Sequence, residues 1–306
     1  MLRVTSDWPP LSVDDPAIIT CAISGSLADR AQCPAIPYTP QEYGAEARRI
    51  VDEGGVMIHI HARRPDGAPS YATEDFAAIT DAIRSEVGDA VIVNYSTGAL
   101  GVSMEQRVAY LRALKPEVAA VNMGSMNYAK YSARRKAFVF DTVFCNPFSE
   151  IQRFLEVMRE EGIRPEHECF DVGHVGSLHP LTDMGLLGEL LHVDLVMGVT
   201  GGIPPTARNL ALMADNVPAG AHWGVIGIGR VQWRLVGAAL ALGGSVRVGL
   251  EDNFYLPDGS MAASNGELIA RARRLAEDLG RRPATVAEAR AMLALAPRAG
   301  PPGGSG

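Results

Sequence analysis

The sequence has few cysteines, no long apolar run and no excess of basic residues. Its four cysteines are scattered over 306 residues and form no C-x-x-C pair, so we expect reduced thiols and a cytoplasmic protein. No apolar stretch is long enough to cross a membrane, and residues 1–16 lack the segments of a secretory signal. The formal net charge of -7 argues against a general polyanion binder. We therefore expect no membrane or nucleic-acid partner. The net charge does not argue against a local phosphate-binding pocket.

A G-x-G-x-x-G turn is also missing after the first apolar run, which argues against an open nucleotide-binding sheet. Instead, eight short β-rich runs alternate with helical segments. We expect strands at residues 17–23, 56–62, 90–94, 118–122, 167–171, 193–199, 222–229 and 246–250. This alternation indicates parallel strands with crossover helices, and eight repeats favour a closed (β/α)8 TIM barrel of the α/β class.

The barrel is predicted to be a single domain over residues 1–296, followed by a flexible tail at residues 297–306. Residues 124–144 are interpreted as a long loop with one extended piece near residues 138–144. Residues 174–191 are expected to contain a helix. The other helices are expected at residues 40–53, 73–87, 103–114, 149–161, 206–215, 231–242, 264–279 and 285–295.

Two histidines stand two positions apart in the second predicted strand. Because strand side chains alternate between faces, His59 and His61 point the same way, while Ile58 and Ile60 point the other way. Two neutral imidazoles on one face are half of a metal site. A chance pair on an exposed face is the alternative, but this strand reads as buried on both sides, where unpartnered histidines would be costly.

Polar residues gather at the carboxyl ends of the predicted strands, which is the end of a barrel that carries the chemistry. They are Asn94, Ser96, Thr97, Asn122, Ser125, Glu168, Asp171, His174, Arg247, Glu251, Asp252 and Asn253. Taken one at a time, such residues are common in turns and helix caps. Taken together at one mouth of a barrel, they favour a functional site.

The last predicted strand supplies a third candidate metal ligand. By strand parity, Arg247, Gly249 and Glu251 share a face, and this strand lies one strand away from the His-x-His strand in a closed barrel. Glu251 is therefore expected to approach His59 and His61. Two histidines and one carboxylate bind zinc with open positions for substrate, and the same set suits iron(II). The alternative is that Glu251 only caps the following segment.

The sequence resembles the β-keto acid cleavage enzymes over about residues 17–290. The resemblance is carried by His59-Ile60-His61-Ala62-Arg63, Ser96-Thr97-Gly98, Gly124-Ser125-Met126-Asn127, the run from Glu168 to His174, the run from Gly227 to Arg230, and the run from Arg247 to Asn253. It implies a TIM barrel, usually a homo-oligomer such as a dimer or tetramer. It also implies a reaction in which a β-keto acid and acetyl-CoA give acetoacetate and a new acyl-CoA.

The resemblance also implies roles for individual residues. One zinc ion per chain would be held by His59, His61 and Glu251, and Asp252 would act as the base with help from Arg247. We expect Arg247 to lower the pKa of Asp252. The residues assigned to substrate binding are Ser96, Thr97, Asn122, Ser125 and Glu168.

The loop after the first strand departs from the family pattern. Many relatives place an acidic residue soon after its first glycine, whereas this chain has Ser26 or Leu27 there. The amino substrate of the best-described member, 3-keto-5-aminohexanoate, is therefore not carried over.

Glycine-rich turns follow the sixth and seventh predicted strands. Gly201, Gly202 and Gly229, with Arg230 nearby, are predicted to receive the phosphates of coenzyme A, because such turns often bind phosphate through backbone N–H groups. The alternative is that the glycines only permit tight turns. A metal-dependent aldolase or hydrolase that uses no coenzyme A stays open as the second function, and a non-catalytic binding protein as the third.

Overall fold

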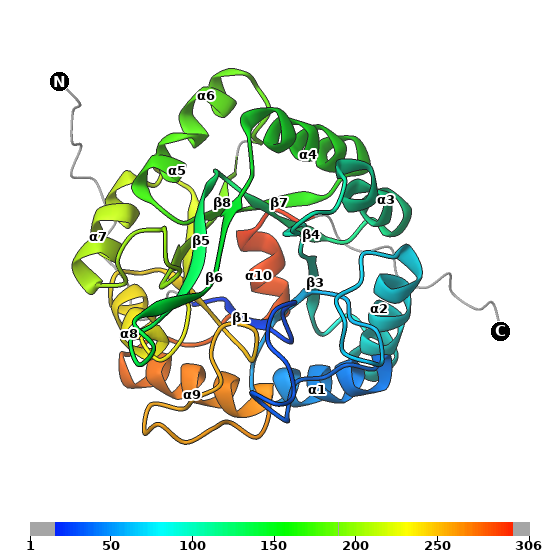
Figure 1. The fold of residues 1–306 in the computed structure, drawn as a ribbon, viewed down its shortest axis with the longest axis vertical. Helices are drawn as coiled ribbons and strands as arrows, with labels where there is room; N and C mark the ends of the chain where they lie inside the picture. The colour runs from blue at the N-terminus through cyan, green and yellow to red at the C-terminus, as the bar shows by residue number, and fades with distance from the viewer. Residues whose placement is uncertain (1–15, 189, 296–306) are drawn as a thin grey trace.

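The computed structural model describes residues 16–188 and 190–295. Eight parallel strands close into a barrel in the order β1-β10-β9-β8-β7-β4-β3-β2, as seen end-on in Figure 1. These strands are β1 (Ile19–Ala22), β2 (Met57–Ile60), β3 (Ile92–Tyr95), β4 (Val118–Asn122), β7 (Arg164–Cys169), β8 (His192–Met197), β9 (His222–Gly227) and β10 (Ser245–Val248). The predicted TIM barrel is confirmed.

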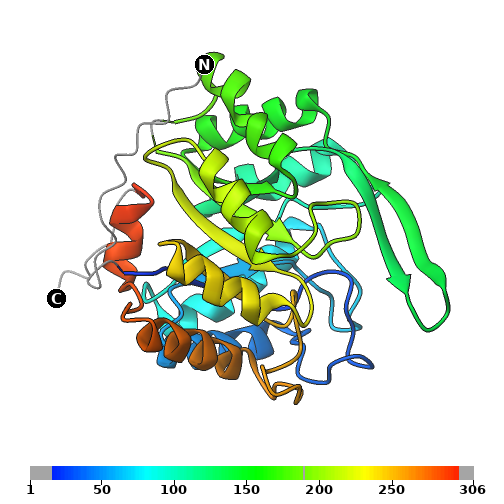
Figure 2. The same cartoon turned by 90° about the vertical axis from the view of Figure 1, so that its left-hand side faces the viewer.

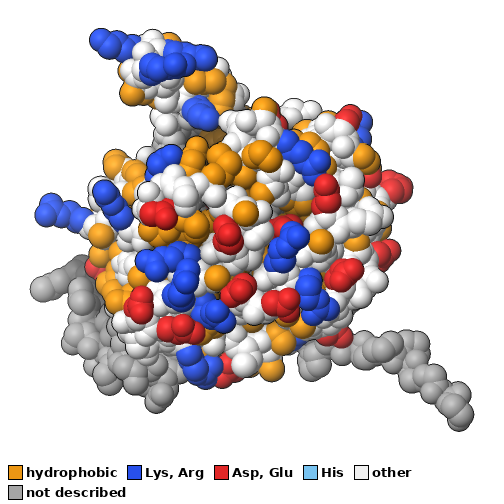
Figure 3. Space-filling view, turned by 90° about the horizontal axis from the view of Figure 1, so that it is seen from below, with side chains coloured by type: hydrophobic (Ala, Val, Ile, Leu, Met, Phe, Trp, Pro, Cys, Tyr) orange, Lys and Arg blue, Asp and Glu red, His pale blue; other side chains and the backbone are white. Residues whose placement is uncertain are grey.

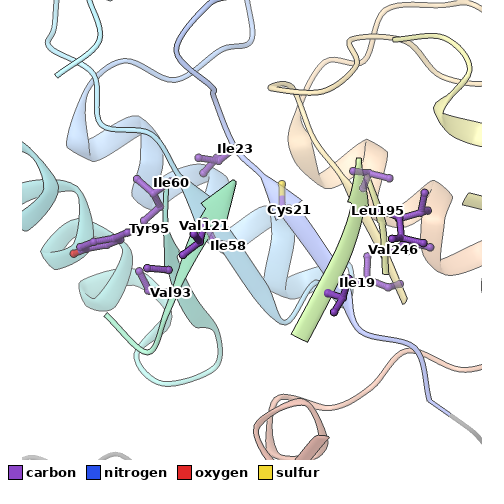
Figure 4. Close-up of a cluster of buried hydrophobic side chains, with 14 of the residues drawn as sticks. Ile19, Cys21, Ile23, Ile58, Ile60, Val93, Tyr95, Val121, Leu195 and Val246 are labelled. Atoms are coloured by element: carbon purple, nitrogen blue, oxygen red, sulfur yellow. The ribbon is translucent and has the colours of Figure 1, made fainter. Parts of the chain in front are cut away.

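Helices surround the barrel because each strand is apolar on its outer face. Figure 4 shows Ile19 and Cys21 of β1 and Ile58 and Ile60 of β2 in this buried layer, on the faces opposite the barrel interior. The helices around the barrel are α1 (Pro40–Asp52), α2 (Thr73–Val87), α3 (Met104–Leu114), α4 (Phe148–Glu161), α5 (Val172–Gly176), α6 (Leu178–Asp183), α7 (Ala207–Asn216), α8 (Gln232–Ala241) and α9 (Asn265–Asp278).

The helix α10 (Val286–Met292) closes the amino-terminal end of the barrel, behind the strands in Figure 1. Ala289 and Leu293 pack there against Ile18, Met57 and Val118 from the starts of three strands. The opposite end, where the strands finish, is therefore the end that stays open for a site. Among the described residues, none of the helices is both long and apolar enough to cross a membrane.

A projecting hairpin is the main departure from the sequence prediction. The strands β5 (Met126–Ser132) and β6 (Ala137–Phe144) pair antiparallel and extend away from the barrel, as Figure 2 shows. The interpretation of residues 124–144 as a loop was wrong for its first half, because the strand pattern is interrupted by the basic turn at residues 133–136. Figure 3 shows Lys and Arg side chains gathered at the projecting end, beside exposed apolar groups.

Two smaller predictions also need correction. The fifth barrel strand begins at Arg164 rather than at residue 167, and Asp171 is the N-cap of α5 rather than part of the strand. The helix expected within residues 174–191 is found, as the end of α5 followed by the short helix α6. The predicted tail at residues 297–306 lies outside the described residues.

Candidate active site

A cavity of about 320 Å³ opens at the carboxyl ends of the barrel strands. Residues that end or follow β2, β3, β4, β7 and β10 line it, namely His59, His61, Ser96, Asn122, Glu168, Arg247, Glu251 and Asp252. The hairpin contributes Tyr128 and Phe144 to the same cavity and crosses in front of this end of the barrel in Figure 1. Because parallel strands all end here, residues that are far apart in sequence meet at one mouth.

His59, His61 and Glu251 form a possible metal-binding group. The Oε1 atom of Glu251 lies 3.9 Å from Nε2 of His59 and 3.4 Å from Nε2 of His61. Burial, together with the charge of Arg247, lowers the pKa of His59 well below its ordinary value, so this imidazole is neutral and free to bind a metal. Burial opposes ionisation of Glu251, but His61, Arg247 and His59 hold its pKa well below its ordinary value. The three donors fit a divalent cation.

Glu251 lies close to the histidines, but the backbone that places it there is not the predicted strand. The strand β10 ends at Val248, so Glu251 lies in the turn that follows rather than in the strand pleat. Gly249 has φ +143, and a Cβ there would lie 2.1 Å from the carbonyl oxygen of Ala22. The backbone N–H of Glu251 donates to that same carbonyl at 3.1 Å. The strand-parity argument was therefore wrong, although the proximity that it predicted is found.

Arg247 is the centre of the charged cluster. Its guanidinium donates from Nε and Nη2 to the two oxygens of Asp252, both at 3.0 Å. It also donates to Oε1 of Glu168 at 2.9 Å and to Oε1 of Glu251 at 2.8 Å. A planar fork of five N–H groups is suited to such sharing. Arg247 therefore fixes three carboxylates around one edge of the cavity.

Asp252 has a pKa opposite to the predicted direction. Burial and the negative charge of Glu251 outweigh the attraction of Arg247 and raise the pKa of Asp252 to about 7. The expectation that Arg247 lowers this pKa below its ordinary value was wrong, because the sequence gives no measure of how deeply the carboxyl group is buried. A carboxyl group with a pKa near neutrality is well matched to exchange a proton during a reaction.

The residues predicted to bind substrate divide into two groups. Ser96, Asn122 and Glu168 line the cavity. Thr97 instead donates its hydroxyl to the carbonyl of Ala120 at 2.6 Å. The hydroxyl of Ser125 accepts from the backbone N–H of Asn146 at 2.7 Å, at the base of the hairpin. Thr97 and Ser125 are not among the lining residues.

Gly201, Gly202 and Gly229 are not among the residues that line the cavity, although Val199 and Ile228 of the same turns are. A Cβ on Gly201 would lie 1.8 Å from the carbonyl oxygen of Asn127 in the hairpin, and the N–H of Gly202 donates to Val199. The N–H of Gly229 donates to the carbonyl of Asp252 at 2.8 Å. Arg230 is exposed, with its guanidinium 3.8 Å from the ring centre of Tyr255. Phosphate binding by these turns stays a prediction.

Sequence analysis missed a buried polar network beneath His59. Asn94 of β3 donates to Glu166 of β7, and Glu166 lies 3.9 Å from Nδ1 of His59. Burial and Asp194 raise the pKa of Glu166, while Glu166 and His192 overcome burial and keep the pKa of Asp194 low. The protonated form is therefore favoured at Glu166 and the ionised form at Asp194. The sequence does contain a carboxylate at an inward position of each of the two strands, Glu166 in β7 and Asp194 in β8. Glu166 was overlooked because the fifth strand was predicted to start after it.

Comparison with known proteins shows which family has this cavity. The family model described as beta-keto acid cleavage enzyme matches residues 16–295. The chain belongs to the β-keto acid cleavage enzyme family. The match includes every residue of the cavity cluster, so the family resemblance seen in the sequence is confirmed for this β-keto acid cleavage enzyme.

Curated relatives of this β-keto acid cleavage enzyme carry several names. A 3-keto-5-aminohexanoate cleavage enzyme of Fusobacterium nucleatum is 37% identical over 278 residues, which cover 91% of this chain and 97% of the relative. A 3,5-dioxohexanoate:acetyl-CoA acetone transferase of Paraburkholderia graminis is 36% identical, with 91% of this chain and 95% of the relative covered. A 3-dehydrocarnitine:acetyl-CoA trimethylamine transferase of Rhizobium meliloti is 30% identical, with 94% and 100% covered.

A solved structure supports the fold of this β-keto acid cleavage enzyme. The apo structure of ObcA superposes with a TM-score of 0.73 at 21% identity, and the match covers 87% of this chain and 66% of that chain. At this identity the comparison bears on the barrel fold alone, which it supports independently of the strand pattern.

Proposed function

We propose that this enzyme exchanges acyl groups between a β-keto acid and acetyl-CoA, giving acetoacetate and a new acyl-CoA. The observation that carries the proposal is the carboxylate of Asp252, fixed by Arg247 directly beside the His59, His61 and Glu251 group in one cavity. Two of the curated relatives described above are named as acetyl-CoA transferases, which supports the co-substrate.

The donors in the cavity fit one zinc ion per chain. Two imidazoles and a carboxylate are a set that binds zinc and leaves positions open, and here His59 is neutral and Glu251 ionised. When bound, a Lewis-acid metal polarises a ketone oxygen and stabilises negative charge that develops on it. The unpartnered Oε2 atom of Glu251 is buried and has its lone pairs available for such an ion.

Asp252 is proposed as the base of the reaction. The carbon between the ketone and the carboxylate of a β-keto acid is acidic, and Asp252 lines the cavity next to the metal-binding group. Its carboxylate takes the proton from that carbon, and the resulting carbanion accepts the acetyl group of acetyl-CoA. The released thiolate then attacks the original ketone carbon and takes the original acyl group as the carbon–carbon bond breaks. Asp252 returns its proton to the acetoacetate carbanion that leaves, so the exchange balances. Arg247 orients Asp252, and Ser96 and Asn122 are proposed to hold the substrate.

We further propose a cytoplasmic homo-oligomer, a dimer or tetramer. The reduced state of the cysteines is consistent with the location, because Cys21, Cys33 and Cys169 are buried and unpaired. The apolar side chains exposed on the hairpin, such as Phe138 and Val143, support association. Arg230 remains the proposed cation for the coenzyme A phosphates, since its exposed side chain lies next to the turn after β9.

Cleavage of the keto acid is expected to require acetyl-CoA. The purified enzyme, loaded with zinc, is incubated with a β-keto acid in the presence and absence of acetyl-CoA, and acetoacetate and remaining keto acid are measured. Acetoacetate should form only with the thioester, because the acetyl group that completes it has no other source. Equal consumption of keto acid without any thioester would favour the aldolase or hydrolase alternative.

Glu166→Leu is expected to weaken zinc binding by about 10- to 100-fold, the usual effect of losing the support behind a histidine ligand. Nδ1 of His59 and Oε1 of Glu166 are both buried without a partner, and the Asn94–Glu166 pair is beside this ring. Zinc affinity is measured by competition with a chelator.

Two further variants control this prediction. Glu166→Gln keeps an oxygen acceptor and should retain most of the affinity. Glu117→Leu removes a part-buried glutamate that pairs with Arg84 and Arg290 away from the cavity, so it should lower stability without changing zinc affinity. An unchanged affinity in Glu166→Leu would show that Glu166 does not position His59.

A further inference from the structure

The walls of the cavity carry no charge outside the Arg247 cluster. Among the described lining residues, the ionisable acids and bases are His59, His61, Glu168, Arg247, Glu251 and Asp252, and all of these belong to the cluster described above. Burial raises the pKa of Tyr128 to about 12 and also raises that of Tyr71, so both phenols are neutral. The apolar members of the lining are Leu27, Ala28, Pro69, Ala99, Leu100, Phe144, Phe170, Val196, Val199, Ile226 and Ile228.

From this distribution we infer that the keto acid carries an apolar, uncharged side chain on its ketone carbon. The inference rests on the proposed function and adds the chemical class of the group that is transferred to coenzyme A. The charged cluster accounts for the carboxylate and ketone that every β-keto acid shares. Only the rest of the cavity can distinguish one β-keto acid from another, and that part is uncharged and mostly apolar.

Two leucines at the mouth have solvent-exposed surface that such a side chain would cover. Leu27 in the loop after β1 is 59% exposed, and Leu100 in the loop after β3 is 45% exposed, and both line the cavity. Covering apolar surface is favourable at about 25 cal/mol per Å². A hydrocarbon side chain gains from this contact, whereas a charged group placed there loses its water and meets no partner.

Two arginines beside the loop after β1 already have partners of their own. Arg63 is buried and donates to the carbonyls of Ser24, Gly25, Ala28 and Gly67, so its charge holds the wall in place. These contacts also make the wall a fixed surface rather than one that rearranges around a substrate.

Arg30 is likewise occupied near this wall. Its Nη2 atom lies 2.6 Å from Oε2 of Glu42, and its Nε donates to the carbonyl of Ile36. With both arginines engaged, neither is available to recognise a second carboxylate on the substrate.

The aromatic lining residues do not alter the inference. Phe144 lies between Tyr128 and Phe170, with ring centres 5.8 Å and 6.2 Å away, so these rings pack on one another. A quaternary ammonium group is recognised by free ring faces gathered around the cation. The pantetheine arm of the thioester must share the cavity, but whichever part it occupies, the remaining wall is also without charge.

The test compares β-keto acids whose side chains are uncharged, cationic or anionic. Zinc-loaded enzyme and acetyl-CoA are combined with 3-oxohexanoate, 3-keto-5-aminohexanoate, 3-oxoadipate or a quaternary ammonium β-keto acid, and acetoacetate formation gives kcat/KM. We expect 3-oxohexanoate to exceed each charged acid by tenfold or more. Extension by one methylene should raise kcat/KM by about fourfold, equivalent to ~0.8 kcal/mol.

The outcomes separate the inference from the function on which it rests. If a charged acid is used as well as or better than 3-oxohexanoate, the inference is overturned while the proposed function stands. If none of the acids gives acetoacetate, the proposed function itself fails, and the inference with it.

A variant at the wall gives a second test. Leu27→Glu places a carboxylate in the loop after β1 and should lower kcat/KM for 3-oxohexanoate by tenfold or more. It should raise kcat/KM for 3-keto-5-aminohexanoate, whose ammonium group the carboxylate can pair with. Leu212→Glu is the matched control, because Leu212 is 47% exposed on α7 and does not line the cavity. If Leu27→Glu leaves the preference among the acids unchanged, the side chain does not contact this wall and the inference is wrong.

Discussion

Asp252→Asn should lower kcat by about a hundredfold or more, the usual scale of general-base catalysis, while zinc content and folding stay normal. An amide cannot take the proton that the proposed base must remove. The amide oxygen still accepts one hydrogen bond from Arg247, whose guanidinium contacts both oxygens of Asp252. Glu168 and Glu251 retain their own contacts with Arg247, so the cluster stays assembled.

The measurement is kcat and zinc content determined on the same preparation of the variant. Asp258→Asn serves as the control, because Asp258 is exposed and accepts hydrogen bonds from Ser260 in a surface turn away from the cavity. Normal zinc with near-normal kcat would remove Asp252 from the mechanism. Loss of zinc would instead make Asp252 a ligand and put the assignment of Glu251 in question.

His59→Ala and Glu251→Gln are each expected to lose most of the bound zinc. His59 supplies a buried neutral imidazole, and Glu251 supplies the charge that approaches both histidines. Removing one of three protein ligands leaves too few donors for a stable site. Metal analysis after dialysis against a weak chelator gives the occupancy of each variant.

The control for this experiment is His179→Ala. His179 is exposed on α6 and pairs only with Asp183, so the variant should retain its zinc. Full zinc occupancy in either His59→Ala or Glu251→Gln would contradict the proposed ligand set.

The barrel and the histidine pair could be predicted because both depend on local patterns. Most barrel strands are short apolar runs, although β7 is not. The alternation of side chains along β2 puts His59, and His61 just past its end, on the inner face, away from Ile58 and Ile60. The mouth of the barrel then gathers Ser96, Asn122 and Glu168 without further assumptions. These predictions needed only periodicity and the rule that parallel strands end together.

Other features depend on three-dimensional contacts that a sequence pattern does not contain. The position of Glu251 follows from Gly249, whose close approach to Ala22 ends the strand early. The pKa of Asp252 depends on the balance between burial and two opposing charges. The inward orientation of Glu166 towards Asp194 could not be predicted, because the fifth strand was expected to start at residue 167 rather than at Arg164.

The polar interior of the barrel also limits how much heat tolerance this chain can gain. Most TIM barrels fill the layers below the active site with branched apolar side chains. This chain has Glu166, Asp194 and His192 there, and Gly224 leaves the space that the carboxylate of Asp194 occupies. Replacing such a network with well-packed hydrocarbon commonly raises the melting temperature. Here the same replacement would also remove the polar groups behind His59. A substitution that raises the melting temperature would therefore weaken the proposed metal site.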